Sequence, residues 1–159
     1  MSKKLLDELQ QNNENKLKLR NKVIEWQTQN GDDYTHEATL TFPINPSNRW
    51  HAESLFKTFK FRLMDRCLKF KQDKNIKMAV YLEGEISNKN FHYHCAMRCP
   101  AHMTYDYFSR RIFKTWQGTV KSNSVRVKIK KYTNSGWLSY SSKEINISNT
   151  DVVSEHNSL

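Results

Sequence analysis

The chain has 159 residues, a length that fits one domain, and its 12% aromatic content is ample for a hydrophobic core. Its 26 Lys and Arg residues outnumber 16 Asp and Glu residues, so the formal net charge of +10 favours a polyanionic partner such as nucleic acid, although a Lys-rich proteome would give the same excess. No apolar run approaches the roughly 20 residues that span a membrane, and no secretory signal opens the chain. The three cysteines, without a Cys-x-x-Cys motif, predict buried or free thiols in a soluble intracellular protein.

We predict that residues 1–33 form an N-terminal helical extension. Residues 3–28 have the pattern of a polar helix with sparse apolar positions, and Gly31 then breaks it. We expect this extension to be a docking helix or an oligomer contact. We predict that residues 34–149 form the folded domain and that residues 150–159 form a loose polar tail.

The sequence of this domain predicts elements in the order strand, helix, strand, strand, helix, strand, helix. The strands are expected at 34–43, 76–86, 91–99 and 124–132, and the helices at 50–71, 105–116 and 134–147. Ser47 or Asn48 is expected to cap the first helix, and Gly118 follows the second. This order predicts an α+β fold, a ferredoxin-like split βαβ with a central antiparallel sheet, helices on one face and an added C-terminal helix. We expect the hairpin of the second and third strands to occupy the centre of the sheet.

The stretch Tyr81–Pro100, which contains a His-x-His pair, is the most informative part of the chain. Residues two apart in a strand point to the same face, so His92 and His94 project together. A tight turn between the two strands would place Glu85 opposite His92 and Glu83 opposite His94. Two imidazoles and a carboxylate on one face of a hairpin predict a site for a divalent metal ion, with coordination positions open for a substrate.

The alternative is a pair of structural histidines, which is the commoner situation for two histidines in one strand. The neighbouring residues favour the metal site. The opposite face of the strand is apolar and suited to packing under helices: Phe91, Tyr93, Cys95 and Met97. The histidine face continues with Ala96 and Arg98, neither of which resembles a core residue, so we expect an exposed chemical surface there.

A strictly alternating segment lies near the end of the domain. Apolar residues at one set of positions predict a buried strand face, while cations at the other set either form an ordinary solvated face or contact a phosphate backbone. Like charges that lie this close repel one another unless an anion is bound, which favours the second interpretation. The apolar residues are Val125, Val127 and Ile129. The predicted DNA contacts, including these cations, are Thr41, Arg98, Arg126, Lys128 and Lys130.

Three short motifs occur in order along the domain. They are Thr39-Leu40-Thr41-Phe42-Pro43, His92-Tyr93-His94 and Tyr140-Ser141-Ser142-Lys143-Glu144. Together they resemble the three motifs of rolling-circle replication initiators, which belong to the HUH endonuclease superfamily. The resemblance covers residues 34–147, and the order and wide spacing of the motifs give it its specificity.

This resemblance implies an enzyme that nicks and joins single-stranded DNA at a replication origin of a phage, virus or plasmid. It also implies that Mg²⁺ or Mn²⁺ is held by His92, His94 and one acidic residue. Glu83 and Glu85 are both candidates for that acidic ligand, and Glu83 is preferred because it begins the polar part of its strand.

The same resemblance implies that Tyr140 is the nucleophile and forms a 5′-phosphotyrosine with the nicked DNA. A phenol with a pKa near 10 is ionised in about one molecule in a thousand at neutral pH, so a neighbouring group must assist it. Lys143 is three residues away and shares a helical face with Tyr140. The implied partners are origin DNA, single-stranded or in a hairpin, and a host helicase, in the bacterial cytoplasm or in the nucleus of a eukaryotic host.

Several alternatives stay open. A relaxase or a single-strand transposase would use the same chemistry, and a regulator on the same scaffold would bind DNA without cutting it. Taken alone, Tyr140 is more often a core residue beside Trp137 than a nucleophile. A two-histidine phosphoesterase needs two His-x-Ser/Thr motifs, and the chain contains His102-Met103-Thr104 and His156-Asn157-Ser158. Neither motif lies in a predicted strand, which disfavours this last class.

Overall fold

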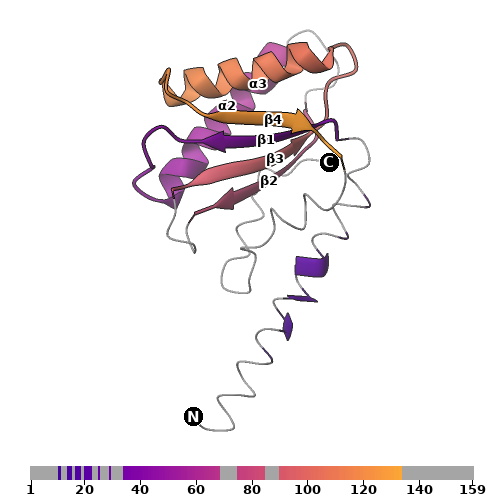
Figure 1. The fold of residues 1–159 in the computed structure, drawn as a ribbon, viewed down its shortest axis with the longest axis vertical. Helices are drawn as coiled ribbons and strands as arrows, with labels where there is room; N and C mark the ends of the chain where they lie inside the picture. The colour runs from indigo at the N-terminus through magenta and orange to yellow at the C-terminus, as the bar shows by residue number, and fades with distance from the viewer. Residues whose placement is uncertain are drawn as a thin grey trace.

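The computed structural model describes residues 34–68, 75–84 and 90–133, together with isolated helical positions between residues 11 and 29. Strands and helices follow one another in the order that the sequence predicts (Figure 1). The predicted C-terminal helix lies outside the described residues. The elements are β1 (His36–Thr41), α2 (Arg49–Leu68), β2 (Met78–Glu83), β3 (His92–Met97), α3 (Tyr105–Val120) and β4 (Val127–Lys131).

The four strands form one sheet in the order β2-β3-β1-β4, with every neighbouring pair antiparallel. This is the ferredoxin-like arrangement expected from the order of the elements. The expectation that the β2–β3 hairpin is central is wrong, because β1 and β3 are the inner strands and β2 forms an edge. Helix α2 carries the chain away from β1 before β2 begins, so β3 pairs with β2 on one side and with β1 on the other.

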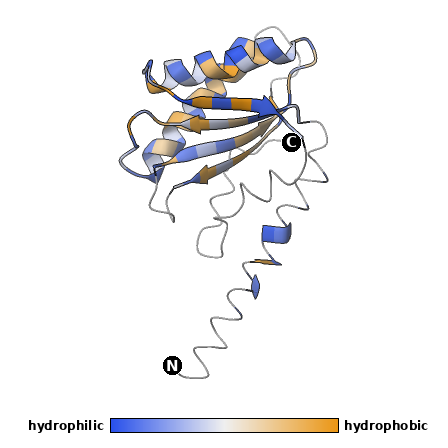
Figure 2. Ribbon diagram, in the orientation of Figure 1, coloured by the Kyte–Doolittle hydropathy of each residue, from blue (hydrophilic) through white to orange (hydrophobic). Residues whose placement is uncertain are grey.

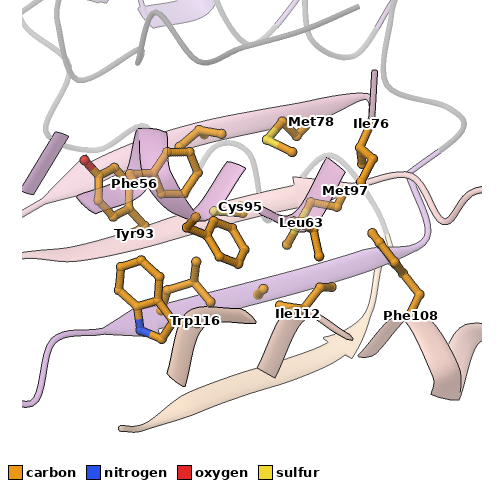
Figure 3. Packing of buried hydrophobic residues seen from close by; sticks show 14 of the residues in the cluster. Phe56, Leu63, Ile76, Met78, Tyr93, Cys95, Met97, Phe108, Ile112 and Trp116 are labelled. Atoms are coloured by element: carbon orange, nitrogen blue, oxygen red, sulfur yellow. The ribbon is translucent and has the colours of Figure 1, made fainter. Parts of the chain in front are cut away.

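Both helices pack on one face of the sheet and form the core shown in Figure 3. Phe56 of α2 lies against Tyr93 of β3, with 4.3 Å between the ring centroids. Trp116 of α3 donates its Nε1–H to the backbone oxygen of Thr41 in β1 at 2.9 Å. Phe59 and Trp116 join the two helices by an edge-to-face contact. His92 and His94 flank the core residue Tyr93 along β3, so they lie on the other face of the sheet.

The helix ends follow local capping geometry. Asn48 caps α2, since its Oδ1 accepts a backbone hydrogen bond at 2.9 Å, which confirms one of the two expected caps. The predicted end of α3 at residue 116 is wrong. The helix continues through Gly118 and ends after Val120, where Lys121 adopts a left-handed φ of 51° and donates its N–H to Gln117 O. A single glycine inside a helix is tolerated at a loss of about 1 kcal/mol.

The three cysteines are free thiols, as predicted. Cys67 and Cys95 are buried and Cys99 is half-buried. Burial raises the pKa of the Cys67 thiol to about 11 and also raises the pKa of Cys95, so both stay protonated at neutral pH. Within the described part of the chain, no helix combines the length and the apolar composition needed to cross a membrane.

Candidate metal centre

The candidate ligands lie on the β2–β3 hairpin. Glu83 is the last residue of β2 and pairs with His92, the first residue of β3, while His94 pairs with Tyr81. The predicted register is therefore wrong by two residues, because the connection between the strands is longer than a tight turn. Side chains alternate faces with a period of two, so this shift keeps Glu83 on the histidine face. Glu85, which was expected opposite His92, lies outside the described residues.

The side chains of Glu83, His92 and His94 converge. Glu83 Oε2 lies 3.3 Å from His92 Nε2 and 3.5 Å from His94 Nε2. The two imidazole rings are 4.9 Å apart between centroids and inclined at 77°, and the three ligand atoms all lie within 4.8 Å of one another. Atoms that bind one ion at about 2.0–2.2 Å are separated from each other by about 3–4 Å. These three residues could therefore hold a metal ion.

Hydrogen bonds at the far nitrogen of each ring orient the two histidines. His92 Nδ1 lies 3.0 Å from the backbone oxygen of Asn90. A carbonyl oxygen only accepts, so Nδ1 carries a proton, and in the neutral ring Nε2 directs its lone pair toward Glu83. His94 Nδ1 lies 3.3 Å from Thr39 Oγ1 of β1, and this hydroxyl oxygen can accept in the same way. Each ring is thus held in place through its Nδ1 atom and presents its Nε2 atom to the position that it shares with the other ring and Glu83.

The electrostatics of this group favour a cation at its centre. The Glu83 side chain is only 2% exposed, and a buried carboxylate needs a compensating charge. Two imidazole lone pairs directed at the same carboxylate oxygen would repel it. A proton on one ring or a divalent cation between the three atoms removes this repulsion. Two nitrogens and one carboxylate oxygen suit a divalent cation, and His92, which is 21% exposed, gives the centre access to solvent.

The backbone of Gly84 allows β2 to end at Glu83. Its φ of 117° lies in a region that residues with a side chain rarely adopt. Gly84→Ala is therefore expected to lower the free energy of unfolding by about 1–3 kcal/mol and to weaken Mn²⁺ binding. Gly118→Ala is the matched control, because an added Cβ there meets no atom within 4 Å. Equal effects of the two substitutions on the melting temperature and on Mn²⁺ affinity would contradict this role of Gly84.

Strands β1 and β4 extend the histidine face toward a basic edge. Thr39 pairs with His94 on one side and with Lys128 on the other, and Thr41 pairs with His92. Lys128 therefore lies two strands from His94, about 10 Å away, on the same face. The predicted alternation of β4 is confirmed, because its apolar residues are less exposed than its cations. The exposed cations on this face are Arg126, Lys128 and Lys130.

The histidine face is not open throughout. Ala96 is buried, as are its partner Ala79 and the neighbouring Tyr81, although α2 and α3 pack on the opposite face. The expectation of an exposed surface at Ala96 is therefore wrong. Ala96 lies beside β2, and every residue of that strand is buried. Arg98 is exposed, as expected. It follows the end of β3 about 13 Å along the strand from His94, so it does not join the metal ligands.

Tyr81 places a phenol on the ligand face, and sequence reasoning did not consider it. It pairs with His94, but burial and two neighbouring tyrosines raise its pKa above the ordinary value for a phenol. A phenol that resists ionisation is a poor nucleophile. Tyr140 and Lys143, the predicted catalytic pair, lie outside the described residues.

Sequence reasoning also missed Thr39 and Asn90 as the residues that orient the ligands. Thr39 belongs to the first of the three motifs, which was a usable signal, but its pairing with His94 depends on the β1–β3 register. Asn90 acts through its backbone oxygen, and no side-chain pattern marks such a role.

Comparisons with known proteins provide no relative from which a role could be transferred. No family model, no curated protein and no solved structure matches the chain. The inferences about function therefore depend on the residues of the site and on the motifs of the sequence.

Proposed function

We propose that this protein is an HUH-type endonuclease that nicks and rejoins single-stranded DNA at a replication origin. The observation that carries the proposal is the convergence of Glu83, His92 and His94 on the sheet face opposite the helices. The Tyr140–Glu144 motif supplies a candidate nucleophile in the sequence order typical of such enzymes. The basic edge along β4 lies on the same face as the ligands, which suits a polyanionic substrate.

The proposed ion is Mg²⁺ or Mn²⁺, held by His92 Nε2, His94 Nε2 and Glu83 Oε2. When bound, it supplies Lewis acidity that stabilises the charge developing on the scissile phosphate. The protein contributes orientation. Asn90 and Thr39 fix the imidazole rings so that both Nε2 lone pairs already face the shared point.

Tyr140 is the proposed nucleophile. Its phenolic oxygen forms a bond to phosphorus while the bond from phosphorus to the 3′ oxygen breaks. The phenol loses its proton and the departing 3′ oxygen gains one, which leaves a 3′-OH and a 5′-phosphotyrosine. Lys143 favours the phenolate by its positive charge. Because one phosphodiester replaces another, attack by a 3′-OH on the phosphotyrosine rejoins the DNA without ATP.

The basic edge is expected to contribute to DNA affinity in a salt-dependent way. Each neutralised phosphate contributes about 0.7 to the slope of log K against log salt for single strands, so Lys128→Gln with Lys130→Gln should lower that slope by up to about 1.4. Fluorescence anisotropy across a salt series measures it. Lys131→Gln is the matched control, because the exposed Lys131 alternates to the other face of β4. An equal loss in the control, or no loss in the double variant, would contradict a DNA track along this face.

The two-histidine phosphoesterase alternative finds little support in the described site. His102 lies in the turn before α3, not in a strand, and its Nε2–H donates to the backbone oxygen of Cys67 at 2.9 Å. The second motif of that class, at 156–158, lies outside the described residues. A relaxase or transposase would share the proposed chemistry and differ in the DNA on which it acts.

A covalent capture assay tests the proposed function. The protein is incubated with a pool of single-stranded oligonucleotides and Mn²⁺, with and without a chelator, and is then denatured and separated by size. We expect a protein band shifted by attached DNA that disappears with the chelator. DNA binding without any covalent product would contradict the endonuclease and favour a regulator. In a parallel incubation with RNA and a chelator, cleavage of the RNA would favour the phosphoesterase.

A further inference from the structure

Two large aromatic side chains stand on the outer side of α2. Trp50 is 82% exposed and Phe61 is 73% exposed. They are eleven positions apart, about three helical turns, so they lie on one side of the helix and about 17 Å apart. The opposite side of α2 supplies the core residues Ala52, Phe56, Phe59 and Leu63. Trp50 and Phe61 thus take no part in the core, and large exposed rings commonly mark an interaction site.

The helical layer that carries these rings is strongly basic. Helices α2 and α3, with the capping residue Lys121, contain nine Lys and Arg residues against three acidic ones, Glu53, Asp65 and Asp106. Figure 2 shows blue hydrophilic stretches along α3, alternating with pale and orange ones. The exposed cations of the layer are Lys57, Arg62, Arg66, Arg110, Lys114 and Lys121. This excess of positive charge is complementary to a polyanion.

The aromatic residues of α2 and the cations of α3 belong to the same outer side of the helical layer. On α2, Lys57 lies one turn before Phe61, between the two rings. On α3, Arg110 and Lys114 are one turn apart on the side away from the sheet. Two cross-helix hydrogen bonds join the C-terminal halves of the two helices, from Arg62 Nη1 to Gly118 O at 3.1 Å and from Arg66 Nη1 to Thr115 Oγ1 at 3.2 Å.

We infer that this outer surface, defined by Trp50, Lys57, Phe61, Arg110 and Lys114, binds a segment of single-stranded nucleic acid. Aromatic rings stack on unpaired bases while cations follow the phosphates, and the bases of a duplex offer no free face for such stacking. A second copy of the chain is a poor occupant, because it would bring the same positive charge to the contact.

The surface is separate from the candidate metal centre. Helices α2 and α3 lie on the face of the sheet opposite Glu83, His92 and His94, as Figure 1 shows for the two layers. Binding at the helical layer therefore needs no metal ion. The inference goes beyond the proposed nicking activity and does not depend on it.

Anisotropy of a labelled oligothymidine of about 20 nucleotides, measured with a chelator present, tests this surface. The double variant Trp50→Ala, Phe61→Ala is expected to lower the affinity by at least about 30-fold, because two stacking contacts are lost. Trp50→Phe should retain most of the affinity, since its ring still stacks. Charge reversal by Arg110→Glu with Lys114→Glu should lower both the affinity and its salt dependence.

Two controls separate this inference from the proposed activity. Ile44→Ala removes a side chain that is 85% exposed but lies outside both helices, and it should leave the affinity unchanged. Glu37→Gln changes a carboxylate on the sheet face opposite the helices and outside the candidate metal ligands, so it should also bind the oligothymidine like the wild type. Wild-type affinity in both helical-layer variants would overturn the inference. Self-association that depends on Trp50 and Phe61, seen by sedimentation without any effect on DNA binding, would overturn it as well.

Discussion

Glu83→Gln is expected to weaken Mn²⁺ binding by more than about 100-fold, since even the loss of an outer partner of a ligand lowers metal affinity by about 10–100-fold. The amide keeps the shape of the carboxylate, so the fold should survive. Without metal, the free energy of unfolding should stay equal or rise, because a buried negative charge facing two imidazole nitrogens is removed. Calorimetric titration measures the affinity. Thermal melts should show that Mn²⁺ raises the melting temperature of the wild type and not that of the variant.

Glu37→Gln is the matched control for this substitution. Glu37 lies on the same face of the sheet, where it pairs with Ala96, but it is not one of the residues that converge at the candidate centre. It should bind Mn²⁺ like the wild type. Full Mn²⁺ affinity in Glu83→Gln, or an equal loss in Glu37→Gln, would contradict the assignment of the ligand.

Tyr140→Phe is expected to abolish the covalent DNA adduct while leaving DNA affinity close to that of the wild type. The phenolic oxygen is the atom that would bond to phosphorus, and phenylalanine removes it with little other change. Denaturing gels and the intact mass of the protein measure the adduct, and anisotropy measures the binding. This separation between chemistry and binding distinguishes a nucleophile from a residue that only stabilises the fold.

Tyr81→Phe is the informative companion variant. Tyr81 lies opposite His94 on the ligand face, yet burial raises its pKa and makes it a poor nucleophile. The adduct should therefore persist when Tyr81 is replaced. An undiminished adduct in Tyr140→Phe, or its loss in a well-folded Tyr81→Phe protein, would remove Tyr140 from the proposed mechanism.

Periodicity in the sequence was sufficient to predict the order of the described elements and the face on which the ligands lie. The two-residue alternation of strands places His92 and His94 together whatever the length of the turn. A register error of two residues leaves Glu83 on the same face, so the candidate ligand group could be predicted even though the pairing of Glu83 was wrong.

Long-range pairing could not be predicted in the same way. The position of β2 at the edge, the contact of Thr39 with His94 and the burial of Ala96 all depend on which strands become neighbours. The role of Asn90 depends on a backbone oxygen, which carries no side-chain signal. Local sequence patterns determine which face of a strand a side chain occupies and how far apart two such side chains lie. The residues that orient the ligands of a site are brought there by tertiary contacts.

Pulsed electron paramagnetic resonance of Mn²⁺ bound to the intact chain tests the metal centre most directly. We predict couplings from the nitrogens of two histidines, with one coupling lost in His92→Gln, one lost in His94→Gln and both retained in His102→Gln. Bound Mn²⁺ that shows couplings to water protons alone, or nitrogen couplings that survive both substitutions in the hairpin, would contradict a metal centre built by Glu83, His92 and His94.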